Sequence, residues 1–285
     1  MAELGKTVGF IGAGNMAEAM INGLIASAVC KPEQIWASDL RSARLSQLEA
    51  KYSIRTSENN TEVFKHADVV VLAVKPQHMD DVLQILSQTL PQALNGVKLV
   101  ISVAAGFPIE RIERHLYPPL DQDTKGLLPI VRVMPNTPAL VRAGIAGMSA
   151  NDFVAKTELR DAETILGAVG KVIQFEEEAL HAVTAISGSG PAYIFYFVEA
   201  FVETGMKLGL RPSQALTLTL ETMKGAAKLL EETKEAPAEL RKKVTSKGGT
   251  TEAALSVLEQ HQVKQHLKDA IRAAAERSVA LGRMH

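Results

Sequence analysis

Two glycine-rich stretches hold the residues of this sequence that are best suited to chemistry. The first is Gly12-Ala13-Gly14-Asn15-Met16-Ala17, which follows an apolar run and opens an amphipathic segment. It fits the pattern G-x-G-x-x-G/A, in which the first glycine permits a tight turn and the second lets the backbone approach a pyrophosphate. Because free N–H groups of the following helix then face the phosphates, we expect residues 12–16 to bind a dinucleotide. A glycine turn without a ligand is the alternative.

The second stretch is Ser246-Lys247-Gly248-Gly249-Thr250-Thr251, which leads into a helical pattern over residues 252–260. Exposed N–H groups at a glycine turn and at a helix N-terminus suit a carboxylate. A threonine in this position is also a common helix cap. From the residues alone, the capping role is favoured for Thr250 or Thr251.

The residues after the second predicted strand bear on which dinucleotide is bound. Asp39 lies where an acidic side chain usually accepts hydrogen bonds from the adenosine ribose, which favours NAD. Ser38, Arg41 and Arg44 lie close by and can hold a 2′-phosphate, which favours NADP. A carboxylate beside a dianionic phosphate is unfavourable unless it turns away, so these residues leave the choice open.

Alternating short apolar and amphipathic segments must position these groups in the first half of the chain. Strands are predicted at residues 7–11, 34–38, 67–74, 98–103, 130–134 and 171–175, with an extended segment at 143–149. Helices are predicted at residues 15–27, 41–51, 82–90 and 154–169. This alternation with short connections indicates a parallel sheet with crossover helices. The run at 67–74 is too apolar to have a solvated face, as in buried parallel strands.

From Glu176 onward the pattern is helical, with breaks at residues 188–191, 209–212, 236–237 and 248–249. We therefore predict one domain at residues 1–175 and an all-α domain at residues 176–285. At the first break, Ser189 or Gly190 is predicted to be an N-cap, with Pro191 as the first helical residue.

The predicted helix at residues 191–208 is apolar almost all round, since Glu199 is the only charge between residues 186 and 202. A helix of this kind must be buried on every side, and a domain of roughly 110 residues rarely encloses one alone. We expect this helix to lie in a subunit interface. A central helix in a monomeric bundle is the alternative.

Several motifs resemble those of the pyrroline-5-carboxylate reductases, and they occur in the same order along nearly the whole chain. They are Phe10-Ile11-Gly12-Ala13-Gly14-Asn15-Met16, Ala73-Val74-Lys75-Pro76, Ser102-Val103-Ala104-Ala105-Gly106, Met134-Pro135-Asn136-Thr137-Pro138, Ser187-Gly188-Ser189-Gly190-Pro191-Ala192-Tyr193 and Val244-Thr245-Ser246-Lys247-Gly248-Gly249-Thr250-Thr251. The last is the most specific. The chain departs from the family at Lys247, where proline is common, and at Asp39-Leu40, where Asn-Arg is common.

The resemblance implies a Rossmann-like α/β domain followed by an all-α dimerisation domain. It implies an oxidoreductase that reduces 1-pyrroline-5-carboxylate to proline, the last step of proline biosynthesis, with NADP(H) as the preferred and NAD(H) as a possible cofactor. It also implies interlocked homodimers through the C-terminal helices, gathered in some members into decamers. The substitution at Asp39-Leu40 puts the family's usual 2′-phosphate contacts in doubt.

Matching the motifs residue by residue implies where the ligands bind. Besides residues 12–16, the cofactor contacts would come from Ser38, Asp39, Arg41, Asn60, Ala73, Val74, Lys75, Ala104 and Ala105, with Asn136 and Thr137 near the nicotinamide. Thr251 would be catalytic, its hydroxyl meeting the substrate nitrogen as donor or proton relay. Ser246, Gly248, Gly249 and Thr250 would complete the substrate site, the glycines and Thr250 through their backbone.

Composition excludes other classes of function. The chain has 31 Lys+Arg against 32 Asp+Glu, so we expect neither nucleic acid nor an anionic membrane as a partner. One cysteine, Cys30, excludes an internal disulfide and fits a reducing cytoplasm. Residues 1–6 do not resemble an export signal, and the scattered histidines predict no metal site.

Two rival functions remain at this level. A β-hydroxyacid dehydrogenase pairs a similar glycine loop with a helical domain. The enzymes of that class resemble one another in a catalytic lysine on the helix that follows a glycine-rich segment. In this chain the first lysine after Gly188 is Lys207, far along the helix, which argues against that class. A non-catalytic dinucleotide sensor would need no substrate loop, so the stretch at residues 246–251 argues against it.

Overall fold

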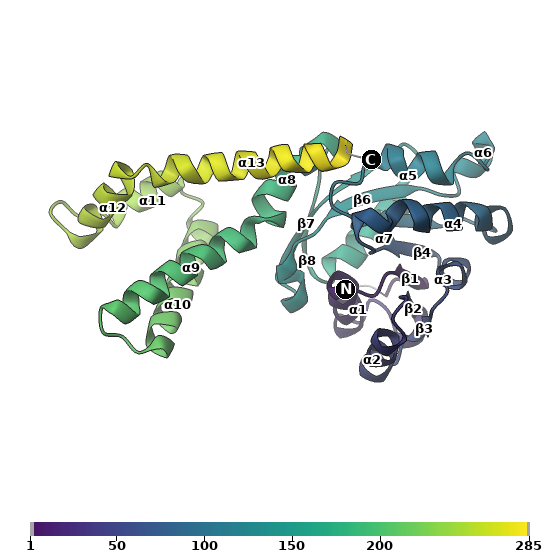
Figure 1. Cartoon of the computed structure of the whole chain (residues 1–285), viewed down its shortest axis with the longest axis horizontal. Helices are drawn as coiled ribbons and strands as arrows, with labels where there is room; N and C mark the ends of the chain where they lie inside the picture. Colours follow the sequence, from purple (N-terminus) through teal and green to yellow (C-terminus); the bar gives the residue numbers. More distant parts are fainter. Residues whose placement is uncertain (1–2, 284–285) are drawn as a thin grey trace. The chain divides into compact units, whose positions relative to one another are not determined.

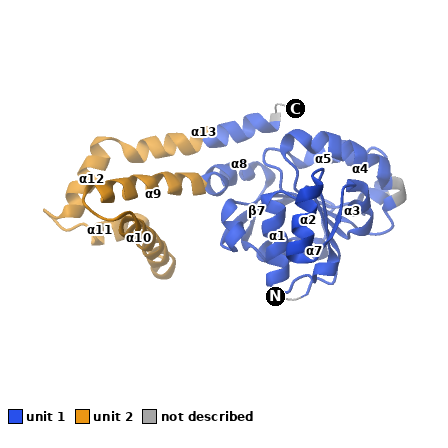
Figure 2. Cartoon of the chain, turned by 60° about the horizontal axis from the view of Figure 1, so that its bottom comes forward, with its two compact units in different colours: residues 1–189, 274–285 blue, residues 190–273 orange. Residues whose placement is uncertain are grey.

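The structure is a computed structural model that describes residues 3–283. It divides into two compact units, which are coloured separately in Figure 2. Unit 1 comprises residues 1–189 and 274–285, and unit 2 comprises residues 190–273. Unit 1 is an α/β structure and unit 2 is helical, as the sequence predicts for the two parts of the chain.

Unit 1 is built on one sheet of eight strands among the described residues. The strands are β1 (Val8–Ile11), β2 (Ile35–Ser38), β3 (Arg55–Ser57), β4 (Val69–Leu72), β5 (Leu99–Ser102), β6 (Ile130–Met134), β7 (Gly144–Ala150) and β8 (Gly170–Gln174). Their order is β3-β2-β1-β4-β5-β6-β7-β8. Neighbouring strands are parallel except for the antiparallel pair β6 and β7. The strand order therefore reverses between β1 and β4.

Helices cover both faces of this sheet (Figure 1). One face packs against α1 (Asn15–Ala26), α2 (Ser42–Tyr52) and α7 (Lys156–Gly167), and the other against α3 (Asn60–His66), α4 (Met79–Ala93) and α5 (Ile109–Leu116). A short helix, α6 (Gln122–Lys125), follows α5.

Strand β4 shows why the sheet must be covered twice. Val69 and Val71 belong to one apolar cluster, whereas Val70 and Leu72 belong to the other, and all four are fully buried. Side chains alternate across a strand, so a strand that is apolar at every position has to be buried on both faces. The prediction of a strand without a solvated face is confirmed.

The passage from the sheet to the helices differs from the prediction. Helix α8 (Leu180–Val183) runs into a π-helical turn at Thr184–Gly188, and α9 (Gly190–Lys207) follows. Ser189 has helical dihedrals (φ −85°, ψ −22°), and its N–H donates to the carbonyl of Thr184 at 2.8 Å. The predicted N-cap at Ser189 or Gly190 is therefore wrong, because the backbone continues through the π-helical turn instead of extending. Such turns occur often at functional sites.

The remaining helices are α10 (Pro212–Thr233), α11 (Pro237–Lys243), α12 (Thr250–Gln260) and α13 (Val263–Arg283). Pro212 and Pro237 each occupy the first position of a helix, where proline has no N–H to leave unsatisfied. The predicted breaks at residues 209–212, 236–237 and 248–249 coincide with these helix ends. No helix among the described residues has the length and the apolar character needed to cross a membrane.

The two compact units divide the chain later than the predicted boundary after residue 175. Residues 176–189 pack on the sheet, where Leu180 is fully buried and Val183 lies against Gly147. The end of α13 also belongs to unit 1, since the Ser278 hydroxyl lies 2.9 Å from Nδ1 of His181. Thus the α13 helix contributes residues to both units.

Helix α9 packs on α10 but has no buried residue within the single chain. Phe195 and Tyr196 are 60% and 72% exposed. An apolar groove of about 440 Å³ lies between α9 and α13, lined by Tyr193, Tyr196, Phe197, Val263 and Leu267 among others. The expected burial of this helix is thus not achieved by the chain's own residues.

Candidate functional site

Loops after neighbouring strands meet at one edge of the sheet in unit 1. Ile11, the last residue of β1, pairs with Ser38 of β2 and Leu72 of β4, and Leu72 pairs with Ser102 of β5. Because these strands are parallel, the segments that follow them leave from the same edge. In open α/β sheets, ligands bind at this edge where the strand order reverses, which here is between β1 and β4.

The glycine-rich loop between β1 and α1 has the backbone that its sequence predicts. Gly12 has φ +93°, and a Cβ there would lie 2.8 Å from Cγ1 of Val74 and 2.9 Å from the backbone of Ala73, so a larger residue does not fit. Around Gly14, in contrast, a Cβ would meet no atom within 4 Å. Gly14 is the N-cap of α1 and has no side chain that could cap the first turn. The first N–H groups of α1 therefore open onto free space, which fits a pyrophosphate.

Ser38 and Asn60 lie together at the same edge but are bonded to each other. The Ser38 side chain is fully buried, and its hydroxyl donates to Oδ1 of Asn60 at 2.8 Å. The Ser38 carbonyl accepts the Gly12 N–H at 2.9 Å. These contacts fasten β2 to the start of the glycine-rich loop.

Asp39 points back to the glycine-rich loop. Its Oδ2 accepts the Ala13 N–H at 3.1 Å, and its Oδ1 accepts both the Arg41 N–H at 3.0 Å and Arg41 Nε at 2.9 Å. The side-chain hydrogen bonds from Arg41 lower the pKa of Asp39; burial opposes this shift, and the two backbone N–H groups add to it. Asp39 is therefore a carboxylate at neutral pH.

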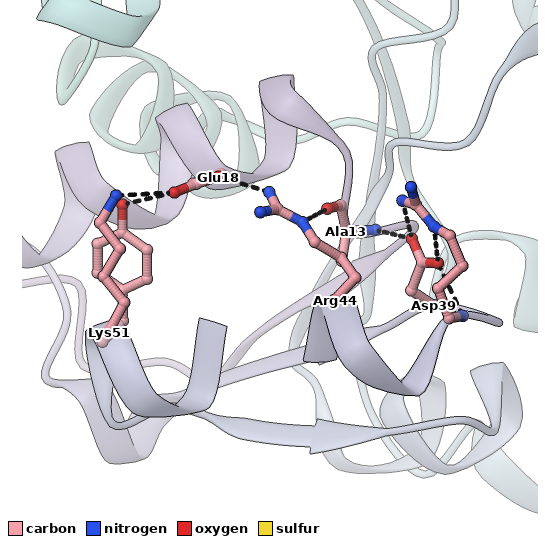
Figure 3. Close-up of polar contacts among 7 residues, drawn as sticks. Ala13, Glu18, Asp39, Arg44 and Lys51 are labelled. Atoms are coloured by element: carbon pink, nitrogen blue, oxygen red, sulfur yellow. Dashed lines mark hydrogen bonds and ion pairs between the residues drawn. The ribbon is translucent and has the colours of Figure 1, made fainter. Parts of the chain in front are cut away.

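Arg44 holds the other side of the Ala13 peptide, as Figure 3 shows. Its Nε donates to the Ala13 carbonyl at 2.7 Å, and its Nη2 forms an ion pair with Glu18 of α1 at 2.5 Å. Glu18 also accepts from Lys51 at 2.9 Å and from the Tyr52 hydroxyl at 3.1 Å. Burial alone would raise the pKa of Glu18, but these hydrogen bonds and the charge of Arg44 lower it to about 2.

The loops after β4 and β5 complete this edge. Ala73 donates its N–H to the Ile11 carbonyl at 2.8 Å, and Val103 donates to the Leu72 carbonyl at 3.1 Å. The predicted cofactor residues that follow these strands range from the buried Ala104 to the exposed Lys75, with Val74 and Ala105 partly exposed. The structure thus gathers all predicted cofactor residues within unit 1.

Asn136 has a structural part in the loop after β6. Its Nδ2 donates to the Ser187 carbonyl at 3.2 Å, and its Oδ1 accepts the Ile145 N–H at 3.0 Å. The amide therefore ties the loop to both the π-helical turn and β7, while Thr137 beside it is exposed.

The predicted substrate residues, Ser246 to Thr251, form a turn and a helix start in unit 2. Gly248 has φ +72°, a conformation that favours glycine, and the Gly249 N–H donates to the Ser246 carbonyl at 3.0 Å. Gly249 is the N-cap of α12 and makes no side-chain cap bond. Neither Thr250 nor Thr251 is the cap, so the capping role that the residues alone favoured is wrong.

Sequence reasoning missed two acidic residues at these sites. Glu252, in the first turn of α12, accepts the Gly248 N–H at 2.7 Å and so places a carboxylate on the turn that is predicted to bind the substrate. Glu18 organises the network behind the glycine-rich loop. Each of these glutamates lies four residues after a glycine of its loop. The sequence shows this spacing, but only the fold shows what each carboxylate contacts. The described residues contain no cluster of metal-ligating side chains.

Comparison with known proteins gives the family. A model of the pyrroline-5-carboxylate reductase dimerisation region matches residues 177–281, and a model described as coenzyme F420-dependent NADP oxidoreductase matches residues 7–106. The pyrroline-5-carboxylate reductase of Pseudomonas aeruginosa is 42% identical over 275 residues, which cover 96% of each chain. The chain belongs to the pyrroline-5-carboxylate reductase family. Family membership excludes the β-hydroxyacid dehydrogenase alternative.

Other members of the family agree in sequence and in structure. The reductase 2 of Bacillus subtilis is 38% identical and covers 97% of this chain and 95% of its own. A reductase structure from Coxiella burnetii superposes with a TM-score of 0.84 at 40% identity, covering 97% of this chain and 98% of that one. A structure from Plasmodium falciparum, with NADP bound, gives 0.86 at 29% identity and covers 99% and 100%. Because the chain contains the family's dimerisation region, it assembles with itself.

Proposed function

We propose a residue-level account of how this chain performs the family's reaction. The chain is an oxidoreductase that reduces pyrroline-5-carboxylate to proline, and it uses NADP(H). The observation that carries the account is the open N-terminus of α1, which lies at the reversal of strand order behind a turn that only glycine fits.

The cofactor binds along the carboxyl edge of β1, β2, β4 and β5 in this proposal. The free N–H groups of residues 14–16 hold the pyrophosphate. Asp39, at the end of β2, lies at the adenosine ribose, and Arg41 lies beside its 2′ position. The backbones of Ala73, Val74, Lys75, Ala104 and Ala105 line the path toward the nicotinamide, while Asn60 supports Ser38. The common edge supports this placement, because all these segments follow parallel strands in register.

The turn at Ser246–Thr251 binds the substrate. Pyrroline-5-carboxylate is a cyclic imine with a carboxylate, and turn N–H groups at a helix N-terminus suit that carboxylate. The Thr250 N–H binds it, and the Gly248 N–H joins when the Glu252 carboxylate gives way. Gly249 shapes the turn through its bond to Ser246, and the Thr251 hydroxyl meets the imine nitrogen. The absence of a threonine cap supports this role, because the hydroxyls are not needed to begin α12.

Reduction requires a hydride at the imine carbon and a proton at nitrogen. The nicotinamide supplies the hydride, and the protein supplies position and electrostatics. The imine is basic enough to be protonated in the site, so a hydroxyl that donates to nitrogen suffices and a strong side-chain acid is not required. Thr251 is the group of this chain that holds or relays that proton.

The self-assembly is an interlocked dimer through α9 and the other C-terminal helices, and such dimers gather into rings such as decamers. The exposed aromatic side chains of α9 support the dimer, because a second copy would cover them. The enzyme works in the cytoplasm in this proposal, which fits its single, unpaired cysteine.

Initial rates with pyrroline-5-carboxylate and either NADPH or NADH test the proposal. We expect saturable oxidation of NADPH, with proline formed in equal amount. NADH should be oxidised with a lower kcat/KM. Binding of both nucleotides without any turnover would contradict the assignment and favour a related imine substrate or a sensor.

A further inference from the structure

Two arginines follow β2, and the structure uses them in different ways. The sequence offers Ser38, Arg41 and Arg44 as ligands for a ribose 2′-phosphate. All three lie at the carboxyl end of β2 or in the first turn of α2, beside the loop that holds the pyrophosphate in the proposed function. The hydrogen bonds that each side chain makes show which of the three is available to a ligand.

Arg44 is committed to the protein. Its guanidinium donates to the Ala13 carbonyl and pairs with Glu18, and the side chains of both residues are about one-fifth exposed (18% and 20%). Lys51 and Tyr52 hold the other oxygen of Glu18 (Figure 3). Removing Arg44 from this network would leave the Ala13 carbonyl and one oxygen of the Glu18 carboxylate without a donor, which is costly where water is partly excluded.

Arg41 is bound much more loosely. The Arg41 side chain is 66% exposed, and its guanidinium pairs with Asp39 within the part of the chain that the structure describes. An exposed ion pair contributes little net stability. Asp39 does not depend on that guanidinium, because it also accepts the backbone N–H groups of Ala13 and Arg41 itself. The side chain of Arg41 can therefore leave while the carboxylate stays bound.

The serine is excluded on similar grounds. Ser38 is fully buried, and its hydroxyl already donates to Asn60. Leu40, the residue between Asp39 and Arg41, is 90% exposed and carries no polar group. Of the groups at this strand end, only the Arg41 guanidinium is both charged and free to turn.

We propose that Arg41 is the cofactor-discriminating residue, which exchanges the Asp39 carboxylate for the ribose 2′-phosphate, whereas Arg44 positions the glycine-rich loop for either cofactor. A phosphate dianion offers more acceptor oxygens than a carboxylate and binds arginine through paired hydrogen bonds. Asp39 stays on the Ala13 N–H and keeps the loop in place. The inference rests on the proposed placement of the cofactor along this edge.

Binding of two nucleotide fragments to the full-length protein tests this division of roles without any turnover. The probes are 2′,5′-ADP and 5′-AMP, which differ in the 2′-phosphate, and isothermal titration calorimetry measures their Kd. The variants are Arg41→Gln and Arg44→Gln. Lys65→Gln, which removes one exposed charge from α3, is the control.

We expect Arg41→Gln to raise the Kd for 2′,5′-ADP by at least about tenfold, since a charge-assisted bidentate contact is lost. The Kd for 5′-AMP should stay within about twofold of the wild-type value. Arg44→Gln should weaken both probes by a similar factor, because it loosens the loop that they share. Arg44→Lys, which keeps the charge but not the paired geometry, should weaken both as well. Lys65→Gln should change neither.

Two results would overturn the inference, and they are distinct from failure of the proposed function. If Arg41→Gln bound 2′,5′-ADP as tightly as the wild type while 5′-AMP still bound, Arg41 would not contact the 2′-phosphate. If Arg44→Gln lost only 2′,5′-ADP, the two roles would be reversed. If the wild type bound neither probe, the placement of the cofactor itself would be wrong, and the inference with it.

Discussion

At the scale of single residues, the peptide of Ala13 shows how side chains outside the glycine motif set its geometry. Asp39 accepts its N–H and Arg44 donates to its carbonyl. The motif supplies the turn, but these two side chains, both from the β2–α2 region, fix the direction in which the next N–H groups point. We therefore expect a change at either position to affect cofactor binding from outside the motif.

Asp39→Asn should raise the preference for NADPH over NADH. An asparagine oxygen still accepts a backbone N–H, but the negative charge that repels a 2′-phosphate and holds Arg41 is lost. We expect the ratio of kcat/KM for NADPH to that for NADH to rise about three- to tenfold, equivalent to about 0.6–1.4 kcal/mol. Asp68→Asn is the matched control, since Asp68 also accepts a backbone N–H, that of Thr7, directly before β1. An unchanged ratio would mean that Asp39 does not face the ribose.

Thr251→Ala should lower kcat and spare cofactor binding. Removing a positioned hydroxyl that meets the imine nitrogen takes away a donor used in the transition state, an effect on the order of 10²-fold. Thr251→Ser restores a hydroxyl and should recover much of the rate. Steady-state kinetics and NADPH titration separate the two effects. If NADPH affinity fell strongly instead, Thr251 would belong to the cofactor site.

Glu252 contacts the turn proposed to bind the substrate, because its carboxylate accepts the Gly248 N–H. Glu252→Gln keeps an acceptor for that N–H but removes the negative charge, which repels the carboxylate of the substrate. We therefore expect the KM for pyrroline-5-carboxylate to fall about threefold while the free energy of unfolding stays unchanged. Glu252→Ala also loses the contact that begins α12 and should destabilise the protein by about 1 kcal/mol. Glu259→Gln, at the far end of the same helix, is the control. A KM that rises in the glutamine variant would show that the charge assists the substrate.

At the scale of elements, α1 and α2 are joined by the Glu18 network, and its stability depends on pH. The pKa of Glu18 is lowered from 4.5 to about 2 in the folded protein. Its contribution is therefore fully present above pH 4.5 and is lost as the pH falls toward 2. Glu18→Gln should lower the free energy of unfolding by about 1–3 kcal/mol at pH 7, and this difference should shrink between pH 4.5 and 2.

Urea unfolding at a series of pH values measures this difference. Glu110→Gln is the control, because Glu110 is paired with Arg114 on the exposed surface of α5, with 72% of its side chain exposed. That variant should lose little at any pH. A difference for Glu18→Gln that stayed constant from pH 7 to pH 2 would contradict the network's role.

The elements that the sequence predicted are those with a clear apolar period. Strand β4 and helix α1 were placed within a few residues of their observed bounds. The pattern of α1 leaves one face for water, and that of β4 leaves none. Strand β3 was missed because Arg55–Ser57 is three residues long, polar and at the sheet edge. The extended segment over β7 was foreseen, but its antiparallel pairing with β6 depends on contacts that no local pattern encodes.

The same limit applies to the site. The glycine loop was predictable because turn, strand and helix follow one another within a few residues. The choice between Arg41 and Arg44 was not, since a difference of three positions does not say which guanidinium meets Glu18 from α1. A break was predicted at residues 188–191 because Gly188 and Gly190 also suit a loop. Contacts such as that of Asn136 with the Ser187 carbonyl hold the preceding turn helical, and the helix continues through the predicted break.

At the scale of the whole molecule, the exposed aromatic face of α9 requires a partner surface. Phe195 and Tyr196 are more than half exposed and lie on a helix within the region that matches the family's dimerisation model. Buried aromatic side chains contribute much of the energy of an interface, and a charge placed among them without a partner is strongly unfavourable. Wild-type protein should therefore sediment without monomer at micromolar concentration.

Tyr196→Glu should release monomers and abolish most of the activity. The substitution places a carboxylate in the groove between α9 and α13, where Phe197 and Leu267 are neighbours, so association should weaken by several kcal/mol. Ile85→Glu is the matched control, since Ile85 is an exposed aliphatic residue of α4, outside the matched dimerisation region. Sedimentation velocity, with circular dichroism to confirm folding, distinguishes the variants. A folded Tyr196→Glu variant with the wild-type sedimentation coefficient would place the interface on another face, because a lone carboxylate cannot remain in a closely packed aromatic contact without loosening it.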